Sequence, residues 1–383
     1  MGSTTAILCY LCIIISITVT AVSDADCNYN GANISGSCVC VRPWIGLLCD
    51  MLDLSNVTSE SVLLGYQGVA NDGSAISSWG GSVILDDDGV SHMYLAEIEG
   101  GCGINVWLSN SAVIHASSPD PLTVPFKRVS VVQGVFSHEP IAVRAPTGEF
   151  VVYFTAVLPP GLLPVNGPGN GIGEPCTGCS NGISVKSCGT DSNRNASINL
   201  PTYMVYSMNP DGPWSPPALV PSTDVFADSN FAPWINTDGS LLALGRNLIW
   251  KALDWKNVSS YTVIGSWIDN GEDPFIWRTA DGIYHGIIHH GRPRSYGIHY
   301  YSETNGFSWV GANTKIGWSK AFSSTIQYSN GTDETFFCRE RPHIVLNKEG
   351  TIMALTNGAA LVACHEAGAD DHSFTFLQGM NNN

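Results

Sequence analysis

Five stretches of the chain repeat one pattern of apolar and polar positions. Each is an apolar run, a tight turn that ends in glycine, and a second apolar run. The first runs cover residues 81–85, 139–143, 232–235, 273–277 and 341–345, and in four of them the second residue is proline. Because proline lacks the N–H that a β-ladder needs, it belongs at the start of a strand. Each copy therefore predicts two antiparallel strands, with the residue before proline at the entrance of the inner one.

A second apolar pattern follows most of these copies. Residues 114–117, 204–207 and 299–302 repeat it clearly, and 249–252 and 361–364 are weaker versions. Five units of about four strands each predict an all-β protein, a five-bladed β-propeller over residues 53–376. A β-sandwich with coincidental turns is the alternative, but it gives no reason for the same motif at the start of a strand to occur five times.

The N-terminus has the composition of a targeting segment. Residues 6–22 are apolar and uncharged, and Ala21-Val22-Ser23 fits a cleavage site, so residues 1–23 are predicted to be a signal peptide. The chain is then secreted or extracellular. Since residues 1–5 hold no Lys or Arg, a membrane anchor formed by an uncleaved segment is the alternative.

Cysteines and sequons agree with an oxidising compartment. Ten cysteines lie beyond Cys9 and Cys12, an even number that suits disulfides. Cys338 and Cys364 lie in the same predicted blade and are a candidate pair, while the connectivity of the other propeller cysteines stays open. Five sequons predict N-glycosylation, at Asn33, Asn56, Asn195, Asn257 and Asn330.

Residues 158–200 interrupt the second predicted blade. This insertion is rich in Gly, Pro, Asn and Ser and contains Cys176, Cys179 and Cys188. A loop of this length inside a compact domain is usually functional or disordered. The cysteines favour a disulfide-bonded surface loop at the rim of a pocket over half of a zinc site, because no second Cys or His pair follows at the expected spacing.

Charge and composition narrow the class of partner. The net charge is −16, which argues against nucleic acid and against anionic polymers. Aromatic residues make up 10% of the chain and charged residues only 13%, a balance that favours a neutral glycan. The sequence contains no serine-hydrolase elbow, phosphate loop or dinucleotide fingerprint. The oligomeric state is not predicted.

Charged residues gather at the predicted strand entrances. Because the innermost strands of a propeller line one channel, the carboxylates of Glu139, Glu272, Asp273 and Glu340 are expected to meet there. Glycoside hydrolysis needs one protonated and one ionised carboxyl group, so Glu139, Asp273 and Glu340 are the catalytic candidates. In the alternative interpretation Arg339 and Arg341 only neutralise Glu340 and Asp273 as structural pairs.

Other residues are candidates for the wall of the site. Trp79 and Trp107 could stack on a sugar, although a buried Trp is more often part of the core. The full set of substrate-binding candidates is Trp79, Trp107, Glu272, His299, Arg339 and Arg341. No cofactor or metal site is required, but His299 could help to hold a channel cation such as Ca2+. Of the adjacent His289 and His290, at most one can point inward from a strand.

Several short sequence motifs resemble those of known glycosidases. Residues 272–277, 298–302, 339–342 and parts of 102–117 look like phrases of family 43-like hydrolases, in the clan of five-bladed propeller glycosidases that includes arabinanases, β-xylosidases and invertases. The likeness spans about 300 residues. It implies the propeller fold and action on the glycosidic bonds of a neutral poly- or oligosaccharide.

The resemblance also implies acids at the first three blade entrances, and here the chain departs from it. Those positions are Gly81, Glu139 and Ala232, so two of the three acids are missing. Either the chemistry has moved to Glu139, Asp273 and Glu340, or the propeller is a non-catalytic carbohydrate-binding or adhesion protein.

Residues 24–50 resemble an EGF-like module that has lost two cysteines. The match covers a Cys-x-Cys, a Trp-x-Gly and the final cysteine. The pairing in such modules implies the disulfides Cys27–Cys38 and Cys40–Cys49. It also implies a unit that docks on an extracellular protein partner, or alternatively a disulfide-bonded spacer packed on the propeller.

Overall fold

The protein is described here by a computed structural model. It describes residues 24–58, 64–70, 73–156, 178–180, 183–186, 200–221, 230–246, 248–267, 271–303, 305–311, 320–364 and 371–381. The predicted signal peptide and Asn195 lie outside these residues. Within the described part of the chain, no helix is long and apolar enough to cross a membrane.

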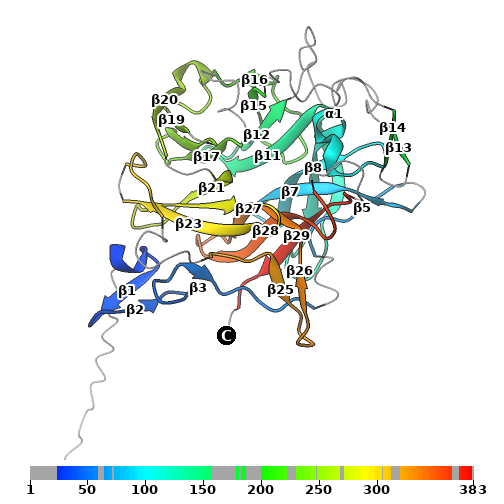
Figure 1. Cartoon of the computed structure of the whole chain (residues 1–383). Coiled ribbons are helices and arrows are strands. Elements are labelled where there is room, and N and C mark those ends of the chain that lie inside the picture. The colour runs from blue at the N-terminus through cyan, green and yellow to red at the C-terminus, as the bar shows by residue number, and fades with distance from the viewer. Residues whose placement is uncertain are drawn as a thin grey trace, which may run out of the picture.

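Five antiparallel sheets form the blades of a propeller (Figure 1). The first blade has, from the centre outward, β7 (Ser78–Leu85), β8 (Ser91–Ile98), β9 (Ser111–Ser118) and β10 (Lys127–Gln133). The second has β11 (Ser137–Arg144), β12 (Phe150–Ala156), β15 (Thr202–Ser207) and β16 (Ala218–Leu219). The third has β17 (Ala232–Ile235), β18 (Leu241–Leu244), β19 (Leu248–Ala252) and β20 (Thr262–Ser266).

The last two blades complete the ring. The fourth has β21 (Glu272–Arg278), β22 (Tyr284–His290), β23 (Tyr296–Ser302) and β24 (Val310–Gly311), and the fifth has β27 (Cys338–Leu346), β28 (Ile352–Ala360) and β29 (Phe374–Gly379). The innermost strands β7, β11, β17, β21 and β27 contact their neighbours all round the ring. The predicted five-bladed propeller is confirmed, and each repeated phrase supplies an innermost strand.

The chain closes its ring by bringing the segment before the first blade back to the last one. Leu54 bridges Met380, and Tyr66 bridges Thr375 of β29. The backbone N–H of Ser55 also donates to the carbonyl of Gly379 at 2.9 Å. Pairing between the two ends of a propeller satisfies the edge of the last sheet, which would otherwise expose unpaired backbone groups.

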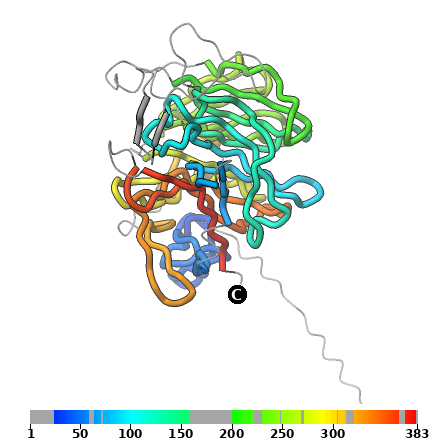
Figure 2. Tube along the Cα trace, turned by 90° about the vertical axis from the view of Figure 1, so that its right-hand side faces the viewer, coloured from blue at the N-terminus to red at the C-terminus, as the bar shows by residue number. Residues whose placement is uncertain are grey.

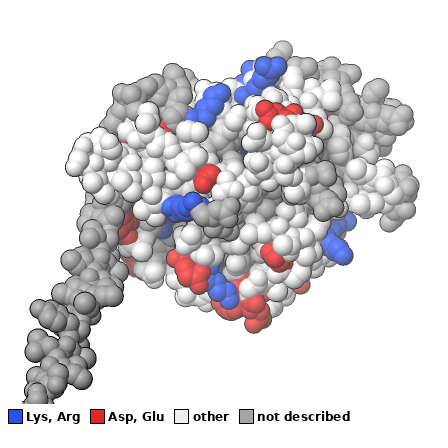
Figure 3. Space-filling model, turned by 90° about the horizontal axis from the view of Figure 1, so that it is seen from below, with Lys and Arg blue, Asp and Glu red and all other residues white. Residues whose placement is uncertain are grey.

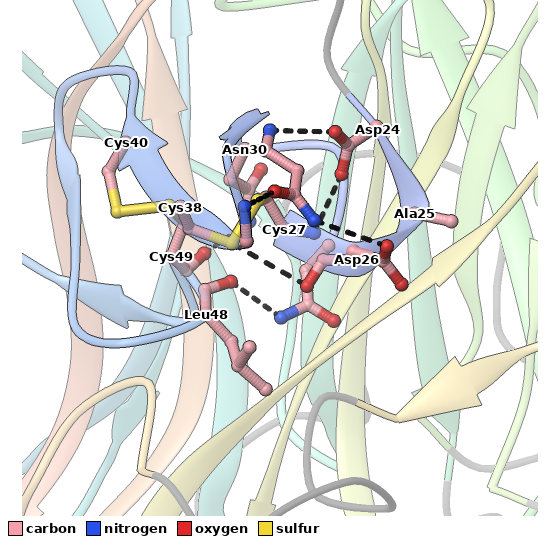
Figure 4. The surroundings of a disulfide bond; sticks show 12 residues. Asp24, Ala25, Asp26, Cys27, Asn30, Cys38, Cys40, Leu48 and Cys49 are labelled. Carbon is pink, nitrogen blue, oxygen red and sulfur yellow. Dashed lines mark hydrogen bonds between the residues drawn. A yellow bond between two sulfur atoms is a disulfide. The ribbon is translucent and has the colours of Figure 1, made fainter.

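The N-terminal module, residues 24–50, folds beside the fourth and fifth blades. It contains η1 (Ala25–Cys27), β1 (Gly31–Ile34), β2 (Ser37–Cys40) and β3 (Trp44–Ile45), and β3 pairs with β4 (Met51–Leu52). The disulfides are Cys27–Cys38 and Cys40–Cys49, as expected from the resemblance (Figure 4). The carboxylate of Asp24 accepts hydrogen bonds from the backbone N–H groups of Cys27 and Asn33, at 3.1 and 2.7 Å.

The module is packed firmly on the propeller. The Trp44 ring lies 6.5 Å from that of Trp277 and 4.6 Å from that of His299. The N–H of Leu52 donates to the carbonyl of Ala321 at 3.0 Å. In Figure 2 the module, in blue, lies against the lower side of the propeller. The module is thus packed on the propeller, as a disulfide-bonded spacer would be. Its buried residues belong to one hydrophobic cluster with residues of the fourth and fifth blades.

Two further predictions concern cysteines and sequons. Cys338 and Cys364 form a disulfide in the fifth blade. In the insertion, the structure describes only the backbone of two short paired strands, β13 (Gly178–Ser180) and β14 (Ile183–Lys186). The sequon residues that are described are all exposed, as glycosylation would require: Asn33, Asn56, Asn257 and Asn330.

Candidate functional site

Four innermost strands carry the same irregularity near their first residues. The pairing register shifts between Trp79 and Ser82, between His138 and Ile141, between Glu272 and Phe275, and between Glu340 and His343. In each shift, the residue after the first-named one has a positive φ: Gly80 (67°), Glu139 (56°), Asp273 (54°) and Arg341 (51°). A bulge redirects a side chain, and a left-handed non-glycine residue is uncommon and costly. The conformation is thus retained at Glu139, Asp273 and Arg341, three neighbouring strand entrances where a bulge turns a charged side chain.

The bulges correct two positions inferred from the proline pattern. In the first blade the residue equivalent to Glu139 is Gly80, one position before the predicted Gly81. In the third blade Asn230, with a φ of 64°, reaches the pocket, whereas Ala232 is fully buried within the strand. Proline marks where a strand becomes regular. The apolar pattern does not reveal how many residues form the bulge before the proline. Among the described residues, neither blade supplies an acid at the pocket.

The strand entrances surround a pocket of about 170 Å3. Its lining is polar and aromatic and comprises Trp79, Trp107, His138, Glu139, Leu200, Asn230, Arg246, Glu272, Asp273, Arg292 and Glu340. Trp107 begins the short helix α1 (Trp107–Asn110), and its ring lies 4.7 Å from that of His138. The three predicted catalytic carboxylates therefore come together in one pocket, with Trp79, Trp107 and Glu272 beside them.

Arg341 connects two of these carboxylates. Its Nη1 lies 3.2 Å from Oε1 of Glu139 and 3.1 Å from Oδ1 of Asp273. The side chain crosses the space above Gly80, where an added Cβ would lie only 3.1 Å from Nε of Arg341. A side chain at position 80 would therefore crowd the arginine from the fifth blade that reaches acids of the second and fourth.

The two carboxylates joined by Arg341 have pKa values displaced in opposite directions. Burial raises the pKa of Glu139, and the adjacent Asp273 adds to this rise against the opposing effects of Arg341 and Arg246. Burial alone would also raise the pKa of Asp273, but Arg341, His289 and Arg292 outweigh it and hold that pKa well below its usual range. Such opposite displacements separate a proton donor from an ionised carboxylate.

The other two carboxylates are held by arginines from neighbouring loops. Arg292 binds Glu340 with two contacts, Nε to Oε1 at 2.8 Å and Nη2 to Oε2 at 3.0 Å. Its Nη2 also donates to Glu272 at 2.9 Å, and Arg246 pairs with the second oxygen of Glu272. Glu340 additionally accepts from the hydroxyl of Ser295 at 3.2 Å. The structural pairing expected for Glu340 exists, but its partner is Arg292 rather than Arg339 or Arg341.

Two predicted substrate-binding residues lie away from the pocket. Arg339 donates to the side chains of Asn357 and Gln378, each at 2.9 Å, and lies between the rings of Phe322 and Phe376. Burial without a carboxylate partner lowers the pKa of Arg339 to about 9. His299 hydrogen-bonds to His285 at 2.9 Å and packs on Trp44 of the module. Both residues therefore support the fold. Arg339 faces away from the pocket because it is adjacent to Glu340 in β27, and alternation along a strand turns neighbouring side chains to opposite faces.

Two basic residues of the site were not predicted, Arg246 and Arg292, and a third, His289, was left undecided against His290. His289 is the inward member of its histidine pair, and its Nδ1 lies 3.0 Å from Oδ2 of Asp273. The strand pairing could have identified His289, because antiparallel β21 and β22 place it opposite Glu272. The loop after β22 therefore returns to the pocket and delivers Arg292 there.

A cation has little room among these groups. The ligand atoms of Asp273, His289 and Glu340 lie within 4.8 Å of one another. The guanidinium groups of Arg341 and Arg292 already occupy oxygens of Asp273 and Glu340, and a metal ion would have to displace them. The residues present fit an ion-paired network better than a metal centre.

Comparison with known proteins gives similarity in structure alone. No family model matches the sequence, and a search of curated proteins finds no match. An α-L-arabinofuranosidase from Podospora anserina, solved with cellotriose, is 11% identical, with a TM-score of 0.51 over 87% of this chain and 98% of that one. An exo-β-1,3-galactanase variant from Phanerochaete chrysosporium, solved with β-1,3-galactotriose, is 12% identical, with a TM-score of 0.50 over 85% and 65%.

A third structure is similar at a lower score. The GH43 protein BlXynB from Bacillus licheniformis is 12% identical, with a TM-score of 0.47 over 79% of this chain. This chain spans 53% of the length of BlXynB. The structural neighbours of this five-bladed propeller are thus glycoside hydrolases at low identity. What they share with it is the fold.

Proposed function

We propose that the pocket binds a neutral poly- or oligosaccharide outside the cell and hydrolyses its glycosidic bond. The observation that carries this proposal is the pair Glu139 and Asp273, which share one guanidinium nitrogen and have pKa values displaced in opposite directions. Glycoside hydrolysis requires such a pair, one carboxyl group to protonate the leaving oxygen and one to act while ionised.

The roles follow from the two environments. Glu139, whose pKa is raised and which lines the pocket, donates the proton to the glycosidic oxygen. Asp273 stays ionised and acts on the anomeric carbon. Both carboxylate oxygens contact the same Nη1, so they lie no more than about 6 Å apart, below the roughly 6.5–9.5 Å that separates the carboxyl groups of inverting glycosidases. This separation favours Asp273 as a nucleophile.

The remaining wall suits a sugar. The Trp107 ring, held against His138, offers an apolar face at the pocket, whereas Trp79 is almost fully buried in a core cluster beneath the lining. Oδ1 of Asn230 is buried and has no hydrogen-bond partner among the described residues. Because an unpaired buried acceptor is costly, it is suited to receive a sugar hydroxyl. Arg292, which pairs with Glu340 and Glu272, lines the same pocket.

The test is hydrolysis of aryl glycosides and neutral polysaccharides by the wild type beside Glu139→Gln. The control is Glu349→Gln, in an exposed turn of the fifth blade. Loss of the general acid is expected to lower kcat by about 10²- to 10⁴-fold on substrates with poor leaving groups. The pH profile of the wild type should fall on the alkaline side as Glu139 ionises, and this limb should vanish in Glu139→Gln. Equal rates for the two variants would refute the assignment.

A second candidate function is glycan binding without hydrolysis. It is favoured by the pairing of all four pocket carboxylates with arginines, and by Arg341 in the space beside Gly80. Saturable binding with no turnover by the wild type on any substrate would select this function. The EGF-like character of the N-terminal module and a protein partner bound through it stay predictions.

A further inference from the structure

A second cavity, of about 580 Å3, lies where the segment before the first blade meets the last strand. It shares no lining residue with the pocket of the candidate site. Cavities of about 300–1,000 Å3 hold drug-sized molecules, a size class that includes a disaccharide. We call this cavity the closure groove, and its walls are formed by residues from the segments 55–58, 64–67, 122–125 and 377–380.

The backbone on both sides of Asn56 is fixed to the propeller. The N–H of Ser55 donates to the carbonyl of Gly379 at 2.9 Å, and the Ser55 hydroxyl donates to the same carbonyl at 3.0 Å. The N–H of Val57 donates to the carbonyl of Gln327 at 2.8 Å. Asn56 therefore has a defined place on the wall of the closure groove.

The side chains of this segment are sorted by the groove. Val57 is 2% exposed, whereas Asn56 and Thr58 on either side of it are exposed and line the closure groove. Asn56 and Thr58 are also the acceptor and the hydroxyl residue of a sequon, Asn-Val-Thr. The residue that would carry an N-glycan is thus part of the wall of a cavity large enough for two sugar rings.

The chemistry of the walls suits the inner sugars of an N-glycan, which carry no charge. None of the residues that line the closure groove is charged. Leu122, Leu377 and Met380 supply apolar surface for the C–H faces of a sugar, and Thr123 and Gln67 supply neutral polar groups. The surface seen from below, the side on which the C-terminus lies in Figure 1, carries charged side chains only in small, separate groups (Figure 3).

A covalent link makes a weak contact sufficient. A sugar attached to Asn56 meets the closure groove at an effective concentration of about millimolar or above, because the linkage to the wall is short. Contacts that would hold a free disaccharide only transiently therefore keep a tethered one in place. A neutral lining and a carrier residue in the same wall favour the chain's own glycan over a separate ligand.

We propose that Asn56 carries an N-glycan whose first two sugars lie in the closure groove. The carrier segment is bonded to β29 of the fifth blade, and the opposite wall, with Leu122 and Thr123, belongs to the loop between β9 and β10 of the first blade. The glycan then covers the junction at which the ring closes and contacts both of the blades that meet there. This role does not depend on hydrolysis in the pocket.

The experiment uses the full chain secreted by a eukaryotic cell, with glycopeptides mapped by mass spectrometry. A peptide-N-glycosidase is then applied to the native chain. Because cleavage requires the sugars to leave the groove, release from Asn56 should be about tenfold slower than release from Asn257 if they are out of it about one tenth of the time. Asn257 is the control because it is exposed and belongs to the third blade, and both sites should react at one rate in denaturant.

Substitution tests the groove itself. Thr123→Trp fills the closure groove from its exposed wall and should bring release from Asn56 to the rate at Asn257. Thr262→Trp, at an exposed position of β20, should leave release from Asn56 slow. A slow release from Asn56 that persists in Thr123→Trp would overturn the proposal.

Hydrogen exchange gives a second measure that needs no change in the groove. The peptide that contains Ser55 and Val57 should exchange about tenfold faster in Asn56→Gln than in Asn257→Gln, because the glycan no longer covers the junction. Equal exchange in the two variants would contradict the proposal. So would an unmodified Asn56 in the secreted chain, or release from Asn56 as fast as from Asn257 in the wild type.

Discussion

At the scale of single residues, the pocket depends on an absent side chain. Gly80 has a φ of 67° and lies under Arg341, whose Nη1 contacts both Glu139 and Asp273. Burying two carboxylates this deeply requires a cation with good geometry, because each unpaired charge would cost several kcal/mol. Gly80 thus contributes to the site by leaving space rather than by supplying a group.

This role of Gly80 predicts how it responds to substitution. Gly80→Ala and Gly89→Ala both place a side chain at a positive φ, which is expected to cost about 1 kcal/mol of unfolding free energy each. Around Gly89 no atom lies within 4 Å of the added Cβ, whereas at Gly80 the Arg341 side chain must move. Gly80→Ala should therefore cost about 1–3 kcal/mol more, measured by urea unfolding. Equal costs would show that Arg341 is not confined there.

Some residues of the site were predictable and others were not. Glu139, Asp273 and Glu340 stand at strand entrances that the repeated phrase reveals, so their convergence followed from the propeller alone. Arg292 and Arg246 lie in loops, and loops carry no periodic signal. Arg339 was misplaced because it is adjacent to Glu340 in sequence, and successive strand residues face opposite sides.

At the scale of elements, the N-terminal module and the last blade stabilise each other. Trp44, Leu52, Trp277 and Ile344 belong to one buried cluster, although they are far apart in the chain. The sequence indicated the module and the blade separately. That the module packs on the blade depended on contacts between them, which neither segment encodes alone.

We predict that Trp44→Ala destabilises the whole propeller. The Trp44 side chain is 95% buried, so truncation should lower the free energy of unfolding by about 3–5 kcal/mol. Leu47→Ala, in the same module but exposed, should change it by less than about 0.5 kcal/mol. Denaturant unfolding followed by Trp fluorescence gives both values. A module that unfolds by itself, with the propeller transition unchanged, would contradict the shared core.

At the scale of the whole molecule, buried histidines couple stability to pH. The first and fourth blades repeat one arrangement, in which His92 hydrogen-bonds to His115 and His285 to His299, each at 2.9 Å. Burial lowers the pKa of His115 and of His285 to about 4. Burial, aided by Arg341, lowers the pKa of His343 to about 3. These residues are neutral when folded at mildly acidic pH.

The direction of the pH effect follows from these pKa values. Below about pH 6.5 the unfolded chain binds protons on these histidines, whereas the folded chain binds them only near pH 4 or below. The free energy of unfolding should therefore fall as the pH drops from 6.5 to 4, by about 3 kcal/mol for His285 alone. Urea unfolding between pH 7 and 4.5 measures this, and His285→Gln should remove about one proton from the slope. A flat profile would contradict neutral burial.

The sequence by itself determined the blade count and the innermost strands. Alternating apolar positions and proline-marked entrances are local signals, and repetition turns them into a closed ring. The two disulfides of the N-terminal module followed from its resemblance to a known module. The placement of Glu139, Asp273 and Glu340 around one axis followed from the ring.

Only the tertiary structure decided which groups meet in the pocket and in what ionisation state. The bulges set which residue of each strand turns inward, and a shift of one residue separates Gly80 from Gly81. Arg341 reaches two acids because an unrelated blade leaves it room. Its effect on their pKa values depends on burial and on distances of about 3 Å, quantities that exist only once distant segments have packed together.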